Sequence, residues 1–221
     1  VAVRRQRQMC IRDRSSGVAP IWVDESGQNR IIVIPGANDL IDGSLAIEAL
    51  EKIGKPDVLV GQFEIPMNVN EQVFSYAYKN GVETVLNPAP ANKPSDILLQ
   101  NTSWFIPNEI EFEEIYGDIF NENNLLLFAK NVDTNVVVTL GEKGCAYIKN
   151  NSVKIIKADS VKAIDTTGAG DAFVGAFSFA LASKLDIEEC LKLALKKATD
   201  SVTKKGTQSC LLYTSPSPRD Q

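Results

Sequence analysis

The 221-residue chain contains no histidine and only four cysteines. Without an imidazole it cannot carry a Ser-His-Asp triad or a histidine-ligated zinc ion, so any general base has to be a carboxylate or a lysine. The cysteines do not have the spacing of a metal site, which favours free thiols in a reducing cytoplasm. They are Cys10, Cys145, Cys190 and Cys210.

Long apolar runs and an excess of positive charge are also missing. No apolar run approaches the roughly 20 residues that a membrane-spanning helix needs, and the basic N-terminus has no apolar segment of the kind found in signal peptides. The net charge of −5 argues against nucleic acid as the main partner, because no basic stripe is available to hold a phosphate backbone. The length and the 44% hydrophobic content suit one globular domain.

Both ends of the chain look foreign to the rest. Residues 9–13 (MCIRD) and 210–215 (CLLYTS) can be encoded by DNA segments that are almost reverse complements of each other. Two ends of a natural protein have no reason to be related in this way, whereas the two ends of a transposase-type sequencing adapter are. We therefore set aside residues 1–14 and 210–221 as adapter-derived and expect residues 15–209 to be an internal fragment of a gene.

Between these ends, strand patterns alternate with helix patterns. Strands are predicted at residues 20–24, 30–34, 57–63, 82–86, 103–106, 135–140, 145–149 and 153–157, and helices at 44–53, 68–79, from 108 onward, and twice between 171 and about 204. Several strands are apolar throughout, which predicts an α/β fold whose parallel sheet is covered on both faces. The first two strands predict a small antiparallel hairpin.

Polar residues cluster directly after the predicted strands. They are Glu64, Asn87, Asn108 and Asp165, together with the turn at Gly141. Open α/β sheets bind their ligands in a crevice at the carboxyl ends of the strands. The sequence therefore predicts a ligand crevice at this edge.

The stretch from Asp165 to Asp171 (DTTGAGD) is the strongest local signal. It leads through a glycine-rich turn into an apolar helix, so the amides of Gly168, Ala169 and Gly170 lack helical acceptors and form an anion site. Asp171 lies beside them and can accept a proton, which is what phosphoryl transfer to a hydroxyl requires. Two plainer interpretations stay open. The glycine-rich segment can be only a flexible turn, and Asp171 can be only a helix N-cap.

Other phosphate-binding motifs are not present. The chain has no G-x-x-x-x-G-K-[ST] segment, which excludes a P-loop enzyme. No G-x-G-x-x-G follows a predicted strand, which weakens a dinucleotide-binding interpretation.

Seven short motifs, spread over nearly all of residues 15–208, resemble the ribokinase-like (PfkB) family of sugar and nucleoside kinases. They are residues 35–38 (PGAN), 62–64 (QFE), 87–91 (NPAPA), 108–111 (NEIE), 139–144 (TLGEKG), 165–171 (DTTGAGD) and 205–208 (KGTQ). The resemblance implies a three-layer α/β/α fold with a mostly parallel sheet and a partial β lid at about residues 20–34. It also implies ATP-dependent phosphorylation of a sugar hydroxyl, with D-ribose converted to D-ribose 5-phosphate as the best match.

By this resemblance, Asp171 is the general base and contacts the sugar together with Glu64, while the amides of Gly168, Ala169 and Gly170 form the anion hole. The implied ATP-binding residues are Asn108, Thr139, Gly141, Gly144 and Gly170. Asn108 and Glu111 would position Mg²⁺ through water. The implied potassium site consists of Asp165 and Thr167 with backbone carbonyls near Ser201, Lys204 and Gly206, and its last ligand would come from about position 210, where the adapter begins.

Plainer interpretations stay open for three of these groups. Asn108 to Glu111 can be an acidic first helical turn, residues 139–144 an ordinary turn after a strand, and Glu64 a solvated charge. For the whole chain, the alternatives are a kinase for fructose, 2-keto-3-deoxygluconate or a nucleoside, a nucleotide- or sugar-binding module without turnover, and a structural α/β domain.

The family's N-terminal region, with its first strands, sugar-binding Gly-Gly turn and much of the lid, is expected to be absent from this chain. The chain alone is therefore expected to be inactive. The resemblance also suggests a homodimer formed through the lid.

Overall fold

The structure is a computed structural model that describes residues 15–23, 29–204 and 206. The two ends predicted to be adapter-derived, the turn between the first two strands, and Cys10 and Cys210 lie outside the described residues. In the described part, six strands form one sheet in the order β3-β4-β5-β6-β7-β8, and two more form a separate ribbon, β1-β2.

The central sheet is mostly parallel. Its parallel strands are β3 (Val58–Gly61), β4 (Glu83–Leu86), β5 (Trp104–Phe105) and β6 (Asn135–Thr139), followed by the antiparallel strands β7 (Cys145–Lys149) and β8 (Ser152–Ile156). The turn from β7 to β8 uses Asn150 and Asn151 at φ +50° and +56°, the conformation that tight hairpins favour. These strands confirm the predicted ones, with slightly narrower bounds.

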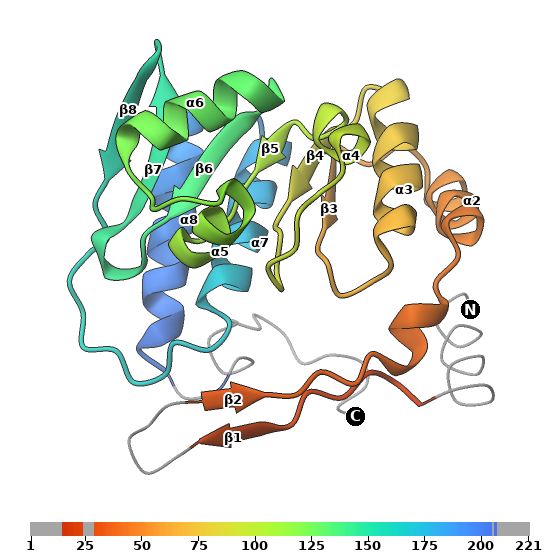
Figure 1. Ribbon diagram of the computed structural model, residues 1–221, viewed down its shortest axis with the longest axis horizontal. Helices are drawn as coiled ribbons and strands as arrows, with labels where there is room; N and C mark the ends of the chain where they lie inside the picture. Colours follow the sequence, from red (N-terminus) through yellow and green to blue (C-terminus); the bar gives the residue numbers. More distant parts are fainter. Residues whose placement is uncertain (1–14, 24–28, 205, 207–221) are drawn as a thin grey trace.

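Helices cover both faces of the sheet (Figure 1). One face packs against α7 (Ala169–Ala182) and α8 (Ile187–Val202). The other packs against α3 (Met67–Lys79), α4 (Asp96–Gln100), α5 (Glu109–Tyr116) and α6 (Glu122–Val132). Outside these, α2 (Gly43–Ile53) lies against α3. The predicted three-layer α/β/α architecture is confirmed.

The apolar strand β6 shows why helices have to cover both faces of the sheet. Val137 packs into the core under α7 and α8, while Val136 and Val138 pack into the core under α3 to α6. Because successive side chains of a strand point to opposite faces, a continuous apolar run needs a helical layer on each side. All three valines are at least 98% buried.

Two of the four cysteines fall in the described part. Cys145 and Cys190 are both free and buried, which confirms the expected free thiols at these positions. Burial raises the pKa of the Cys145 thiol to about 12, so it has little thiolate character at neutral pH.

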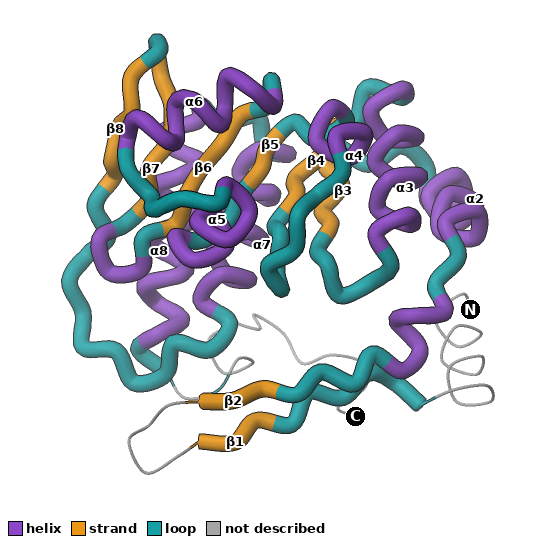
Figure 2. Tube along the Cα trace, in the orientation of Figure 1, coloured by secondary structure: helices purple, strands orange, loops and turns teal. Residues whose placement is uncertain are grey.

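The predicted hairpin is confirmed as a narrow ribbon that lies apart from the three layers. Strands β1 (Ile21–Val23) and β2 (Asn29–Ile31) pair antiparallel, and two hydrogen bonds between Val18 and Ile34 extend the ribbon. A 3-10 helix, η1 (Gly36–Leu40), then leads to α2. In Figures 1 and 2 the ribbon lies below the sheet, on the side to which the loops after β3 and β4 extend. None of the described helices is long and apolar enough to cross a bilayer.

Candidate active site

Backbone hydrogen bonds continue past the carboxyl ends of the parallel strands and keep the residues that follow them in register. Asn87 donates its backbone N–H to the Gly61 carbonyl at 3.0 Å, and Ile106 donates its backbone N–H to the Leu86 carbonyl at 2.8 Å. Gln62, Asn87 and Ile106 each come directly after a strand, so this register places them side by side along one edge of the sheet. It is the edge at which open α/β sheets bind ligands.

The 165–171 motif forms a tight turn before α7. Gly168 has the left-handed conformation, with φ +77°, and is the residue that caps the helix. The N–H of Ala169 donates to the Thr166 carbonyl at 3.3 Å, whereas those of Gly168, Gly170 and Asp171 have no acceptor among the described residues. The helix N-terminus therefore presents unpaired donors, as an anion site requires.

Asp171 is not the N-cap of α7, because the cap is Gly168 and Asp171 lies in the first turn. Its side chain instead accepts a hydrogen bond across the sheet edge: the distance from Gln62 Nε2 to Asp171 Oδ1 is 3.1 Å. The carboxylate is exposed and stands next to the unpaired amides. This placement is compatible with a base and excludes the plainer interpretation of an N-cap.

A pocket of about 500 Å³ lies beside this helix N-terminus. All five residues predicted to bind ATP line it: Asn108, Thr139, Gly141, Gly144 and Gly170. Apart from Glu142, the remaining lining residues come from α7, α8 and the segment between β8 and α7, and most of the exposed lining is apolar. A mostly apolar pocket with a few polar groups at one end suits a ligand that has an aromatic ring and an anionic tail.

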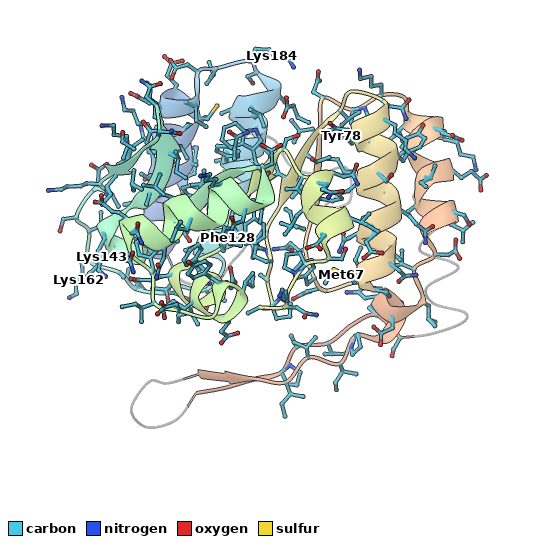
Figure 3. All side chains as sticks on the ribbon, turned by 45° about the horizontal axis from the view of Figure 1, so that its top comes forward. Met67, Tyr78, Phe128, Lys143, Lys162 and Lys184 are labelled. Atoms are coloured by element: carbon cyan, nitrogen blue, oxygen red, sulfur yellow. The ribbon has the colours of Figure 1, made fainter. Side chains whose placement is uncertain are left out.

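Two lysines are neighbours in sequence of residues that line this pocket. Lys143 lies between the lining residues Gly141 and Gly144, and Lys162 follows the lining residue Val161. Figure 3 labels both lysines at the same end of the molecule. The Lys143 ammonium is 3.6 Å from the Glu109 carboxylate.

Asn108 and Glu111 form a reciprocal capping box at the start of α5. Asn108 Oδ1 accepts the Glu111 N–H, and Glu111 Oε2 accepts the Asn108 N–H, both at 2.8 Å. Burial raises the pKa of the Glu111 carboxyl, the hydrogen bond from Asn108 lowers it, and the charge of Glu114 raises it further. Both side chains therefore have a structural role in the helix start.

The same pair can still serve a magnesium ion. Only one oxygen of Glu111 is used by the capping box, and a buried carboxylate gains from a nearby cation. In the part of the chain that the structure describes, no three His, Cys, Asp or Glu side chains gather closely enough to hold a metal. Mg²⁺ usually keeps several waters and takes one or two carboxylates, so the Asn108–Glu111 pair fits a water-mediated site.

The residues predicted for potassium are also brought together. Asp165 Oδ1 accepts the Thr167 N–H, and Asp165 Oδ2 accepts the Gly206 N–H, both at 3.0 Å. The backbone after α8 therefore lies directly beside the Asp165 turn, and the Ser201 carbonyl accepts the Lys204 N–H there. The Asp165 carboxylate and the backbone carbonyls after α8 are oxygen donors, the kind of ligand that hard cations take.

Glu64 lies at the same edge, as an exposed residue in the otherwise half-buried loop between β3 and α3. The loop is fixed on one side by the Phe63 N–H, which donates to the Ala89 carbonyl at 2.9 Å. Ala89 precedes Pro90 through a cis peptide bond. Glu64 is thus available to a ligand approaching the edge.

Comparisons with known proteins identify the family of the chain. The family model described as pfkB family carbohydrate kinase matches residues 5–214. The deoxyribokinase of Salmonella typhi is 36% identical over 201 residues, and the ribokinase of Haemophilus influenzae is 37% identical over 207. These matches cover 88% and 91% of this chain and 66% and 67% of the relatives. The chain thus spans slightly less than two thirds of the length of that deoxyribokinase.

Solved structures show the same fold. Ribokinase from Giardia lamblia has a TM-score of 0.80 at 27% identity, covering 95% of this chain and 76% of that one. Arabidopsis thaliana ribokinase complexed with ribose and ATP has a TM-score of 0.78 at 27% identity, covering 90% and 67%. Because the family model matches most of its residues and these structures share its fold, the chain belongs to the pfkB family of carbohydrate kinases.

Proposed function

We propose that the protein containing this chain transfers the γ-phosphoryl group of ATP to a hydroxyl of D-ribose, giving D-ribose 5-phosphate and ADP. One observation carries the proposal: the exposed Asp171 carboxylate and the unpaired amides of one helix N-terminus stand together beside a 500 Å³ pocket. The relatives support the substrate classes, since they include enzymes named ribokinase and a structure with bound ribose and ATP.

In this proposal, Asp171 takes the proton of the attacking hydroxyl as its oxygen forms a bond to the γ-phosphorus and the bond to ADP breaks. The amides of Gly168, Ala169 and Gly170 stabilise the negative charge on the transferred group. Those of Gly168 and Gly170 are the better donors, because the Ala169 N–H already donates to Thr166. Glu64 contacts the sugar.

Thr139, Gly141 and Gly144 bind the nucleotide on the other side of the pocket. Mg²⁺, positioned through water by Asn108 and Glu111, would neutralise phosphate charge. K⁺, held near Asp165 and the backbone after α8, would brace the turn that carries the amides. Dimerisation through the β1–β2 ribbon and a cytoplasmic location stay predictions.

A second candidate acceptor is 2-deoxyribose. The Salmonella deoxyribokinase is 36% identical to this chain, practically the same as the 37% of the Haemophilus ribokinase. The two sugars differ by one hydroxyl, and discrimination between them depends on whether the site makes a hydrogen bond to it.

The experiment is an ADP-release assay on the full-length protein with Mg²⁺, with and without K⁺. The panel contains ribose, 2-deoxyribose, fructose, 2-keto-3-deoxygluconate and a nucleoside. Ribose should give the highest kcat/KM, and K⁺ should raise it. A different preferred acceptor would retain the kinase and reject ribose, whereas ATP binding without release for any acceptor would indicate a binding module.

Replacing the base tests the role of Asp171 directly. Asp171→Asn removes the proton acceptor and keeps the size and hydrogen-bonding shape of the side chain. We expect kcat to fall by about 10²- to 10⁴-fold while ATP affinity, measured by calorimetry, changes little. A variant that retains its turnover would contradict the assignment.

A further inference from the structure

We propose that Gln62 is the positioning residue for Asp171, and that a chain of side-chain amides anchored in the sheet orients it. This inference rests on the proposed function, because it takes Asp171 to be the base. Gln62 directly follows β3, whereas Asp171 lies on α7, 109 residues later in the sequence.

The chain of hydrogen bonds crosses three adjacent strand ends. Asn87 Nδ2 donates to the Ile106 carbonyl at 2.8 Å, after β5. Gln62 Nε2 then donates both to Asn87 Oδ1 at 2.8 Å and to Asp171 Oδ1 at 3.1 Å. A continuous path therefore connects the backbone directly after β5 with the carboxylate on α7.

The direction of every hydrogen bond in this path is set by its first member. A backbone carbonyl can only accept, so Asn87 must turn its NH₂ group toward Ile106 and its oxygen toward Gln62. Gln62 must then present its own NH₂ group, whose second N–H is directed at Asp171. The reversed orientation of the Gln62 amide would place its oxygen against the oxygens of Asn87 and Asp171.

The anchor of this path is rigid because it is buried. Asn87 is 8% exposed and Ile106 is 1% exposed. A buried hydrogen bond is strong, and breaking it would leave polar groups without a partner in a site that water does not reach. Asn87 therefore gives Gln62 a fixed acceptor.

The backbone of Gln62 is held as well. Asn70, on α3, donates its side-chain amide to the Gln62 carbonyl at 2.8 Å and is itself 3% exposed. Gln62 is thus fixed at the main chain by α3 and at the side chain by Asn87. These two hydrogen bonds restrict the Gln62 side chain to few rotamers, and in this conformation it reaches Asp171 on α7.

Asp171, by contrast, is exposed, and an exposed aspartate is free to change rotamer unless something holds it. Gln62 fixes Oδ1 and leaves Oδ2 to accept the proton of the sugar hydroxyl. Holding a reacting group in its productive geometry contributes to rate, and a displacement of about 1 Å can cost about 100-fold.

The first test is structural and does not need turnover. The 221-residue chain and its Gln62→Leu variant are compared by NMR relaxation and scalar couplings of the Asp171 side chain. We expect one dominant Asp171 rotamer in the unmodified chain and several in the variant. If the Asp171 rotamer population is the same in both, the proposal is wrong, whatever the protein catalyses.

The second test uses turnover of the full-length protein. Gln62→Leu and the similarly shaped Gln62→Glu both remove the N–H donor, and each should lower kcat by about 10- to 100-fold with ATP affinity changed less than about twofold. Gln100→Leu, an exposed glutamine at the end of α4, is the matched control and should leave kcat unchanged. Full kcat in Gln62→Glu would overturn the proposal.

A double-mutant cycle separates positioning from a merely structural role. With Asp171→Asn as background, Gln62→Leu should cost no further turnover, because no base remains to be positioned. An equal loss in both backgrounds would show that Gln62 acts through the fold and would overturn the proposal. Absence of turnover in the unmodified full-length protein would instead reject the proposed function, and the rotamer measurement would still decide the role of Gln62.

Discussion

Glu111 is the one charged side chain, among those whose burial the structure describes, that is more than nine-tenths buried. Its position in the capping box explains why a charge is tolerated there, since Oε2 accepts the Asn108 N–H. Burial raises the pKa of this carboxyl more than the hydrogen bond from Asn108 lowers it, so the pKa is raised overall. Structural and metal-positioning roles can therefore be separated by substitutions that keep or remove the charge.

We predict that Glu111→Gln alters how stability depends on pH. A carboxyl whose pKa is raised by folding contributes stability that is fully present below its ordinary value of 4.5 and is lost as pH rises through the raised value. Glutamine can accept the same N–H without titrating. The free energy of unfolding of the unmodified chain should thus fall relative to the variant as pH rises from below 4.5 to neutral, as measured by urea titration.

The control at this position is Glu111→Ala, which removes the hydrogen bond along with the charge and should be about 1 kcal/mol less stable than Glu111→Gln at all pH values, because neither variant titrates at this position. If Glu111 also positions Mg²⁺, Glu111→Gln should weaken the Mg²⁺ dependence of turnover in the full-length protein. If the free energy of unfolding changes with pH in the same way in the unmodified chain and in Glu111→Gln, burial does not raise the pKa of Glu111 and the prediction is wrong.

At the scale of the element, the N-terminus of α7 contains a glycine that the fold does not require. A Cβ built on Gly170 would meet nothing within 4 Å, and its φ is not in the left-handed region. The residue nevertheless lines the 500 Å³ pocket. The space that a side chain would take is therefore space open to a ligand.

We predict that Gly170→Ala weakens ATP binding at least about tenfold without lowering stability, because alanine is up to about 1 kcal/mol better than glycine in a helix. Gly175→Ala is the matched control: it lies in the interior of α7, its added Cβ also meets nothing within 4 Å, and it does not line the pocket. Calorimetry and thermal unfolding measure both effects. Equal ATP affinity in the two variants would show that the pocket is not the nucleotide site.

The elements differ in how far the sequence alone could predict them. The strand at 135–139 follows from a continuous apolar run, and α2 and α3 follow from helical periodicity with glycine beyond their ends. The helix α4 has five residues, too few to show a period, and was not predicted. Nor was α6, whose Asn121 cap and buried Leu125 and Phe128 lie among asparagines that are poor helix formers.

The site shows the same division. Short motifs located the turn at 165–171 and five of the residues that line the pocket, because these lie within single segments. The capping box was hidden, since the pattern N-x-x-E fits a helix cap and a metal-positioning pair equally well. The contact between Gln62 and Asp171 could not be read from the sequence at all, because it depends on α7 packing beside the end of β3.

At the scale of the whole molecule, the two halves of the proposed reaction draw on different parts of the chain. Every residue that lines the 500 Å³ pocket falls between Asn108 and Val202. For the sugar, only Glu64 and Asp171 are predicted contacts. The chain spans 66% of the length of the Salmonella deoxyribokinase. We therefore expect this chain to contain more of the nucleotide site than of the sugar site.

We predict that ATP or ADP stabilises the 221-residue chain and that ribose alone does not. A ligand present at about 100 times its Kd stabilises by about 2.7 kcal/mol, enough for a clear rise in Tm. Because Gly170→Ala obstructs the same pocket, the variant should lose the shift caused by the nucleotide. Stabilisation by ribose equal to that by ATP would show that the sugar site is already formed by these residues, and ribose-dependent ADP release from this chain would show that they suffice for the reaction.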